Sequence, residues 1–576
     1  MVGPPEIRQR SGGGEAGVTS DAAAAAAADA SQAAGEVLKE VQAWGRVAVT
    51  PRVSSVADTL RRWVHNMHRL VLFLVHTALT AVSILFHARV EQRAAEHAAR
   101  VALAAATTYE GYAAAAGELD VLQGHERWKA ETETPLYNYT LITERLQQLR
   151  DAEGNGDKRL LLRQLRSGLL RNLGGTTGSG LYNVANIGTK YLVMDYIKAV
   201  TATLRQLRDD DSVPLDERYF FFQDTRHAFG RSALLLSGGA GWGMYHLGVV
   251  KALYEHGVLP RVISGSSVGS LVAAIVACTT DEDIPKLFES GALNVDAFEV
   301  KDSANTSFQR KVSRLVRKGY VFDIRKLEDC VRANIGDMTF LEAYEKTHRI
   351  LNITVASTTE FQFPRLLNYL TAPHVLIRSA ACASCALPGL YEPVELMCKL
   401  DDGELVPYSQ SKLEWKDGSL ENDLPMARPS ELFNVNHTIV SQVNPHVLPF
   451  MWNSRRKPTI FSKIYNLCVG ELHHRLMQLY ELDLMPRFAR FLQPLFTQRY
   501  VGDVTLTPSI GIDKFLRLLK NPSDAEIQEA IRDGERTVWP YMSLIKNRVS
   551  IENTLDRCVL ALKPRVKRYQ FSDVAR

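Results

Sequence analysis

The sequence predicts an α/β protein in which a mostly parallel sheet carries helices on both faces. A helical domain precedes this sheet and a helical extension follows it. Between about residues 229 and 450, short apolar runs alternate with helical runs, the order that parallel strands with crossover helices require. The flanking stretches, 91–228 and 451–576, have helical periodicity instead. A length of 576 residues also exceeds what one core usually holds, so several domains are expected.

The alternating region supplies its expected elements in order. The expected strands are residues 233–236, 262–264, 350–356, 366–370 and 438–442. The expected helices, 244–255 and 268–278, each follow one of the first two strands. The region after 450 contains basic patches such as Arg455–Lys457.

Composition excludes several classes of protein. Hydrophobic residues at 46% and charged residues at 23% are typical of a globular chain. A net charge of +4 without a basic stripe or a recognisable module gives no reason to expect nucleic acid as a partner. The odd number of cysteines, seven, indicates a reducing compartment without a disulfide framework. Cys382 and Cys385 form a lone CxxC, which we interpret as packing residues, so neither a metal nor a cofactor is expected.

The N-terminal part has two compositions. Residues 1–40 are Gly-rich and then Ala-rich, so we expect them to be disordered, and they lack the apolar run of a signal peptide, so secretion is not expected. Residues 41–90 contain the most hydrophobic stretch, 70–86, which carries no formal charge. Its seventeen residues would span only about 25 Å as a helix. A membrane-embedded or interfacial segment, a core helix and a bilayer-spanning helix remain alternatives, and the shortness favours a hairpin or a surface-lying helix.

The strongest chemical pattern is Gly265-Ser266-Ser267-Val268-Gly269, which matches the G-x-S-x-G nucleophile elbow. The glycines allow a sharp turn from strand to helix, which leaves Ser267 exposed at the helix N-terminus. An apolar run precedes the pattern and a helical run follows it, as the elbow requires. A tight turn without chemistry is the alternative.

A glycine-rich loop lies about thirty residues earlier, after the first expected strand. Small residues there would let backbone N–H groups approach an oxyanion, and the candidates are Gly238, Gly239, Ala240, Gly241 and Gly243. A dinucleotide-binding loop would need glycine at 244, where the sequence has Met244. One strand–helix–strand unit therefore offers an oxyanion loop and a nucleophile.

These motifs resemble the patatin-like phospholipase family, and more narrowly its branch of fungal and plant triacylglycerol lipases. The resemblance rests on SGGAGWGMYHLGV, on GSSVG, and on Asp417-Gly418 within WKDGSLENDLP. It extends over roughly 450 residues, including LDVLQGHERWK and IGTKYL upstream and ELFNVNHTIVSQVNPH downstream. It implies that 229–450 is a patatin-like catalytic domain and that 91–228 is the helical domain found before it in that branch.

The resemblance implies a Ser–Asp dyad, with Ser267 as nucleophile and Asp417 as general base. The rival pair Asp402-Gly403 lacks the longer family pattern. Asp423 departs from the family because many patatins have Asn there, and Ser419, Gly241 and Trp242 also differ from the commoner residues. A triad through His437 or His446 is the alternative on residue order, while His246 is expected to be a packed helix residue.

The resulting functional expectation is a serine lipid acyl hydrolase. Triacylglycerol is the expected substrate, giving diacylglycerol and free fatty acid at the surface of a lipid droplet or the cytoplasmic side of an intracellular membrane. Phospholipids, lysophospholipids and steryl esters are alternative substrates for the same fold. A non-enzymatic lipid-droplet protein is the alternative class, although Ser267, Asp417 and the glycine loop are all present.

Overall fold

A computed structural model describes residues 54–296, 317, 319–358, 365–409, 413–419, 423–445, 447, 460–482, 498, 500–508, 518 and 520–574. Two compact units make up the chain, residues 1–93 and 94–576. The segment 1–40, His446 and the basic patch Arg455–Lys457 lie outside the described residues, so the expectations for them stay predictions.

Eight strands within the described residues form one sheet, in the order β10-β9-β1-β2-β3-β8-β5 with β4 paired to β3. Five of them run parallel: β10 (Val504–Leu506), β9 (Val435–Ser441), β1 (Arg231–Leu236), β2 (Val262–Gly265) and β3 (Ile350–Ser357). The antiparallel strands are β4 (Arg365–Leu367), β8 (Glu414–Asp417) and β5 (Val394–Glu395). A separate hairpin joins β6 (Met397–Lys399) to β7 (Leu405–Pro407). The prediction of a mostly parallel sheet is confirmed.

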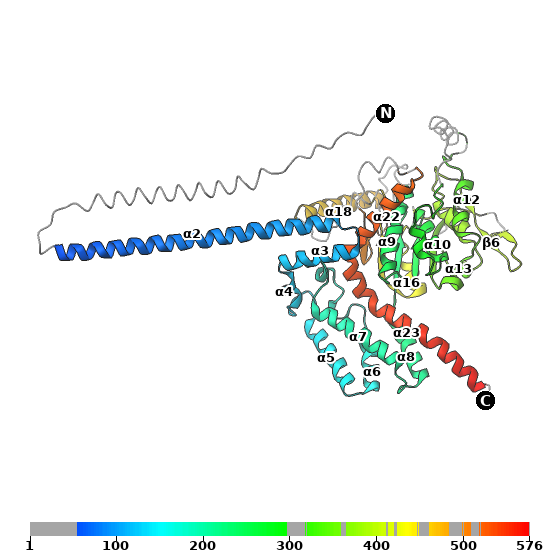
Figure 1. Cartoon of the computed structure of the whole chain (residues 1–576). Helices are drawn as coiled ribbons and strands as arrows, with labels where there is room; N and C mark the ends of the chain where they lie inside the picture. Colours follow the sequence, from blue (N-terminus) through cyan, green and yellow to red (C-terminus); the bar gives the residue numbers. More distant parts are fainter. Residues whose placement is uncertain are drawn as a thin grey trace, which may run out of the picture. The chain divides into compact units, whose positions relative to one another are not determined.

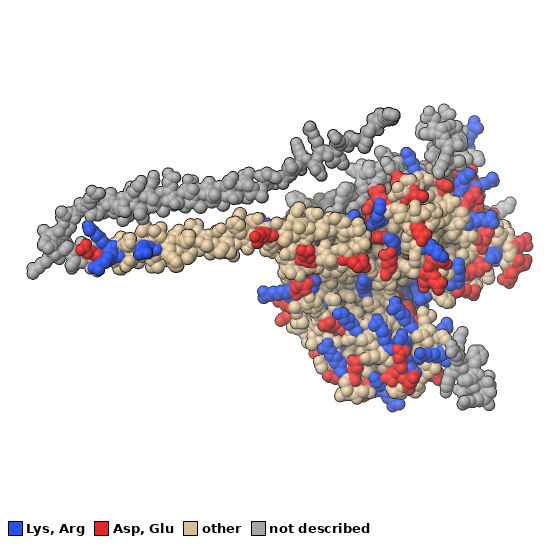
Figure 2. Space-filling model, viewed as in Figure 1, with Lys and Arg blue, Asp and Glu red and all other residues tan. Residues whose placement is uncertain are grey.

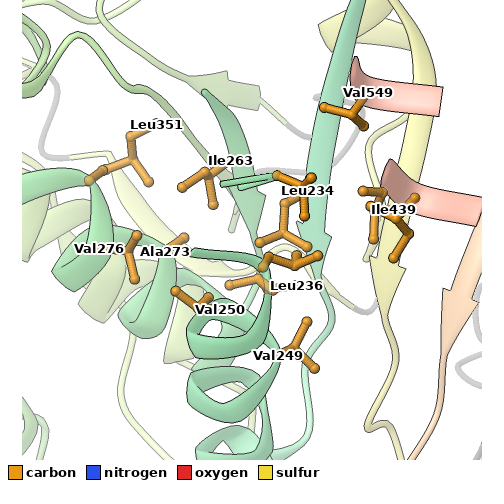
Figure 3. Close-up of a cluster of buried hydrophobic side chains, with 14 of the residues drawn as sticks. Leu234, Leu236, Val249, Val250, Ile263, Ala273, Val276, Leu351, Ile439 and Val549 are labelled. Carbon is orange, nitrogen blue, oxygen red and sulfur yellow. The ribbon is translucent and has the colours of Figure 1, made fainter. Parts of the chain in front are cut away.

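Alternate residues of the central strands face opposite sides of the sheet. Leu234 and Leu236 of β1 point toward α9 (Met244–Glu255) and α10 (Val268–Cys278), where Val250 and Ala273 meet them (Figure 3). Their neighbour Leu235 packs on the other face, in a cluster that includes Phe433. The helix α16 (Ala427–Phe433) packs on this second face, and α13 (Phe340–Thr347) contributes Tyr344 to the same cluster. Helices therefore cover both faces, as the sequence predicts.

The helical region before the sheet shares its hydrophobic core. Its helices are α3 (Tyr109–Leu122), α4 (His125–Ala130), α5 (Tyr139–Gly154), α6 (Lys158–Gly168), α7 (Tyr191–Asp209) and α8 (Leu215–Phe229). The C-terminal helix α23 (Met542–Val574) runs along α7 and α8 (Figure 1). The helices α12 (Ile324–Ile335) and α14 (Ile377–Cys385) pack against α10 beside the sheet.

The stretch 451–576 contains more than the helices that its periodicity predicts. It includes α18 (Ile460–Glu481), α22 (Asp524–Val538) and α23, but also β10, which adds an edge strand to the sheet beside β9. A strand of three residues is too short to show an alternating pattern, which is why the sequence does not reveal it. The division of the chain at 228 and 450 stays a prediction.

Residues 70–86 lie within one continuous helix, α2 (Ser54–Ala105). No glycine or proline interrupts it, so the structure does not contain the hairpin that the shortness favours. The hydroxyls of Thr77 and Thr80 donate to the carbonyls of Phe73 and His76, four residues earlier. The middle of the helix carries no charged side chain (Figure 2). An 18-residue window of this helix has a mean hydropathy of 2.0, and by length and composition the helix could cross a membrane.

Candidate active site

Ser267 occupies the sharp turn between β2 and α10. Its backbone angles, φ 50° and ψ −130°, lie in a region that L-residues rarely adopt. A Cβ on Gly265 would collide with the carbonyl of Gly269, and a Cβ on Gly269 would collide with the carbonyl of Leu236 at the end of β1. Both glycines are therefore required by close backbone approach. This is the strained elbow that the G-x-S-x-G pattern predicts.

The elbow is held by α14 from the side of β3. The Ser267 N–H donates to the Ser384 hydroxyl at 2.9 Å, and that hydroxyl donates to the Thr354 carbonyl at 2.8 Å. The Ser267 N–H is consequently occupied within the protein. The strain at Ser267 is thus stabilised by fixed partners on two neighbouring elements.

Asp417 ends β8 and is 1% exposed. Because β8 pairs with β3 so that Asp417 lies opposite Val355, the carboxyl group lies at the sheet end where β2 leads into the elbow. Its Oδ1 accepts the N–H of Ser419 at 2.8 Å. Its Oδ2 is buried and has no hydrogen-bond partner among the described residues.

Burial raises the pKa of Asp417 to about 7, because the charged carboxylate is removed from water. The N–H and hydroxyl of Ser419 and the hydroxyl of Ser267 lower this pKa, and the nearby Asp423 raises it. The Ser267 hydroxyl is therefore close enough to Asp417 to influence its ionisation. Because Asp417 Oδ2 makes no hydrogen bond, the Ser267 hydroxyl and the Asp417 carboxyl group are near each other but not hydrogen-bonded through this oxygen. Catalytic hydrogen bonds are often long before substrate binds.

Ser267 and Asp417 line one cavity of about 440 Å³. Most of the other lining side chains are aliphatic, and they come from α9, α10 and α12: Leu247, Leu271, Val272, Ile275, Leu327 and Val331. Such a cavity suits an acyl chain and repels a charged group. The structure thus brings together the two residues that the resemblance selects, although 150 positions separate them.

The glycine loop borders the same cavity, but its N–H groups are not equivalent. Gly238 donates its N–H to Asp423 Oδ1 at 2.9 Å, and Gly241 donates to the Leu518 carbonyl at 2.9 Å. No described acceptor pairs with the N–H of Gly239 or Ala240, and both residues line the cavity. Gly239 and Ala240 are therefore the donors that remain for an oxyanion.

The remaining loop glycines serve packing. A Cβ on Gly243 would collide with Val268, the first residue of α10, and Gly243 does not line the cavity. Gly418, after Asp417, lies so close to β3 that a Cβ would stand 2.9 Å from the backbone of Thr354. Gly243 therefore allows the glycine loop to pack against α10, and Gly418 allows the segment after Asp417 to pack against β3.

Asp423 lies between the nucleophile turn and the glycine loop, a position that the sequence analysis did not predict. Its carboxylate accepts the Ser266 hydroxyl at 2.5 Å, the Gly238 N–H at 2.9 Å and the Asn444 side-chain amide at 2.6 Å. It is 2% exposed, and burial raises its pKa to about 6. Its departure from the family's Asn is the one signal in the sequence that pointed to it.

Of the described histidines, neither His437 nor His246 completes a triad with the candidate dyad. His437 is buried and its Nδ1 lies 3.0 Å from the hydroxyl of Ser232, at the opposite end of β1 from the glycine loop. Burial lowers its pKa well below the usual range. His246 is a packed residue of α9, as expected: its Nε2 donates to the Ser237 carbonyl at 3.0 Å, and burial lowers its pKa to about 4. The rival Asp402 lies exposed in the turn between β6 and β7.

The two cysteines of the CxxC are both buried, and burial raises the pKa of each thiol well above the usual range. Cys385 lines the cavity beside the candidate dyad. Within the residues that the structure describes, no group of three or more His, Cys, Asp or Glu side chains is arranged to hold a metal ion.

Comparison with known proteins relates the chain to a family. Residues 234–428 match the model of the patatin-like phospholipases, and residues 89–227 match a domain of unknown function, DUF3336. Triacylglycerol lipase SDP1L of Arabidopsis thaliana is 38% identical, covering 91% of this chain and 66% of the relative. Triacylglycerol lipase 4 of Saccharomyces cerevisiae is 37% identical, covering 80% of this chain and 53% of the relative.

Triacylglycerol lipase ptl3 of Schizosaccharomyces pombe is 35% identical, and the match covers 78% of this chain and 94% of that relative. The chain thus spans nearly all of the Schizosaccharomyces protein but between half and two thirds of the other two. The crystal structure of VipD from Legionella pneumophila overlaps at a TM-score of 0.25 and 13% identity, over 52% of this chain and 67% of that chain. From the sequence relatives and the family match, the chain belongs to the patatin-like phospholipase family.

Proposed function

We propose that the protein is a lipid acyl hydrolase that cleaves triacylglycerol to diacylglycerol and free fatty acid. The proposal is carried by one observation: the strained Ser267 and the buried Asp417 line the same apolar cavity. The names of the three relatives, all triacylglycerol lipases, support the substrate class. The aliphatic lining supports a long acyl chain over a polar group.

The proposed reaction has two halves. Asp417 takes the hydroxyl proton as Ser267 Oγ attacks the ester carbonyl, and the N–H groups of Gly239 and Ala240 stabilise the oxyanion. Collapse of this intermediate breaks the ester bond, and Asp417 returns the proton to the departing diacylglycerol oxygen. Water then attacks the acyl-serine, Asp417 accepts its proton, and the fatty acid leaves as Ser267 regains its hydrogen.

The test is a substrate panel on the purified full chain. Emulsified trioleoylglycerol, phosphatidylcholine, lysophosphatidylcholine and cholesteryl oleate are compared at equal acyl concentration. We expect triacylglycerol to be hydrolysed fastest. Ser267→Ala and Asp417→Asn should each lower kcat by about 10³-fold or more, and the double variant should be no worse than either, because the pair acts as a unit. Hydrolysis by Ser267→Ala near the wild-type rate would refute the dyad, and faster phospholipid turnover would change the substrate class.

We further propose that α2 holds the enzyme at a lipid surface, either a droplet or the cytoplasmic side of an intracellular membrane. Its eleven Leu, Val, Ile and Phe side chains between residues 70 and 86 are all exposed. Burying half of that area in lipid would contribute on the order of 10 kcal/mol. Because triacylglycerol is insoluble in water, an enzyme that hydrolyses it has to bind the lipid surface on which the substrate lies.

The attachment is tested with a matched pair of variants. Leu72→Arg, Leu74→Arg and Leu79→Arg together should release the protein from droplets and lower emulsion activity while leaving a soluble ester unaffected. The control places three arginines at exposed apolar positions of the second unit, Val121, Leu170 and Leu560. Equal droplet binding by both triple variants would refute the role of α2.

A further inference from the structure

Asp423 joins three segments that meet behind the candidate dyad. Its Oδ1 accepts the hydroxyl of Ser266, the neighbour of the nucleophile, and the N–H of Gly238, the neighbour of the oxyanion donors. Its Oδ2 accepts the side-chain amide of Asn444, a residue of the cavity wall after β9. The backbone N–H of Asp423 itself donates to Gln498 Oε1 at 2.8 Å.

The carboxylate is well matched to this position, because every group around it donates. A hydroxyl, a backbone N–H and an amide NH₂ converge on its two oxygens, and a carboxylate accepts all three without donating any. Asp423 does not line the cavity, so it does not touch the substrate. Its place in the network is between the nucleophile turn and the loop that supplies the oxyanion donors.

We propose that Asp423 is a positioning residue, which locks the nucleophile elbow to the glycine loop and holds a negative charge behind Asp417. This inference rests on the proposed function, because it assigns Asp423 a part in that same reaction. The lock fixes the Gly239 and Ala240 N–H groups relative to Ser267 Oγ. Such preorganisation lets the donors meet the oxyanion without reorganising as the reaction proceeds.

The charge has a second consequence for the base. Burial is the main cause of the raised pKa of Asp417, and the charge of Asp423 raises it further because two carboxylates in one dry site disfavour double ionisation. The other groups acting on Asp417 are the Ser419 N–H and hydroxyl and the Ser267 hydroxyl. The thiol of Cys385 also faces Asp417, from α14, and the phenol of Tyr500 faces Asp423. Removal of the Asp423 charge should therefore lower the pKa of Asp417.

Two variants separate the lock from the charge. Asp423→Asn keeps the shape of the side chain and one acceptor oxygen but removes the charge. The midpoint of the rise of kcat/KM with pH should therefore move to lower pH by about half a unit or more. The loss of kcat should be at most tenfold. Asp423→Ala removes the acceptors altogether, so kcat on a soluble ester should fall by about 100-fold with KM changed less than threefold. Thermal unfolding of each variant confirms that it is folded.

The outcomes distinguish this inference from the proposed function. If Ser267→Ala retains hydrolysis, the dyad itself is wrong, whatever Asp423 does. If Ser267→Ala is inactive but kcat/KM of Asp423→Asn rises with pH at the same midpoint as that of the wild type, the charge of Asp423 has no role. If Asp423→Ala folds and keeps kcat within threefold of wild type, the lock has no role. Should Asp423→Ala fail to fold, a Ser266→Ala variant removes one of the three hydrogen bonds to the carboxylate and should lower kcat about tenfold at the pH optimum. An unchanged kcat would overturn the lock.

Discussion

Replacing Asp417 by Asn should make the protein inactive, and the stability of this variant relative to wild type should increase with pH. The structure buries this carboxyl group and raises its pKa from 3.8 to about 7. Between these two values the folded protein holds a proton that the unfolded chain releases. Folded-state stability is therefore lost progressively as the pH rises through this window, and the loss is complete above about pH 7.

The size of the effect follows from the two pKa values. Their difference corresponds to roughly 4 kcal/mol of penalty for the ionised form in the folded protein. This penalty develops between the two pKa values, so about 2 kcal/mol of stability is lost between pH 5.5 and pH 8.5. Asparagine does not titrate. Any cost of its unpartnered amide, about 1–3 kcal/mol, is the same at both pH values and cancels from the comparison.

The assay is thermal unfolding of wild type, Asp417→Asn and Ser267→Ala at pH 5.5 and 8.5 in one detergent. Ser267→Ala is the matched control, because it should also be inactive but keeps Asp417. The Tm difference between Asp417→Asn and wild type should be about 2 °C larger at pH 8.5 for a unit of this size. Ser267→Ala, which keeps the buried carboxyl group and loses a hydroxyl that lowers its pKa, should lose at least as much stability as wild type over the same pH range. A difference that does not change with pH would show that Asp417 is not a buried carboxylate of raised pKa.

Three further predictions concern the site. The kcat/KM for a soluble ester should rise with pH to a plateau with a midpoint near 7, because Asp417 accepts a proton only when ionised; a midpoint near 4 would contradict the assignment of the base. Gly269→Ala should lower kcat more than tenfold, because the added Cβ would collide with the backbone at the end of β1. The control Gly117→Ala, whose added Cβ would meet no atom within 4 Å, should retain activity and gain about 0.5–1 kcal/mol of stability. Equal activity of the two variants would refute the close approach at Gly269. Activity should survive chelation by EDTA, since no metal-binding group occurs in the described part of the chain; loss of activity that a divalent ion restores would contradict this.

The local parts of the site could be predicted from the sequence. Gly265 and Gly269 mark the elbow because only glycine tolerates such close backbone contacts, and the run Val262–Ser264 before them is a strand as expected. The expected helices 244–255 and 268–278 have those bounds in the structure. These signals are local, so the residues themselves are sufficient to reveal them.

The distant parts could not be predicted in this way. Asp417 reaches Ser267 through β8, an antiparallel strand of four residues that no periodicity indicates, and only the family resemblance selected it. The sequence also does not distinguish among the five candidate oxyanion donors, Gly238, Gly239, Ala240, Gly241 and Gly243. Two of their N–H groups are occupied by Asp423 and Leu518, which are far away in the chain. Which donors stay free is a property of tertiary contacts and not of composition.

The eight-stranded sheet depends on residues that follow the region of alternating strands and helices. β10 covers the edge of β9, and without it that edge would expose unpaired backbone groups. Glu552 of α23 accepts the N–H of Ser232 at 2.8 Å, at the start of β1, and pairs with Arg171 of the helical region at 3.0 Å. These charges are nearly buried, so removing one partner would leave the other uncompensated. Because β1 ends in the glycine loop, the C-terminal helix and the helical region help to fix the strand from which that loop departs.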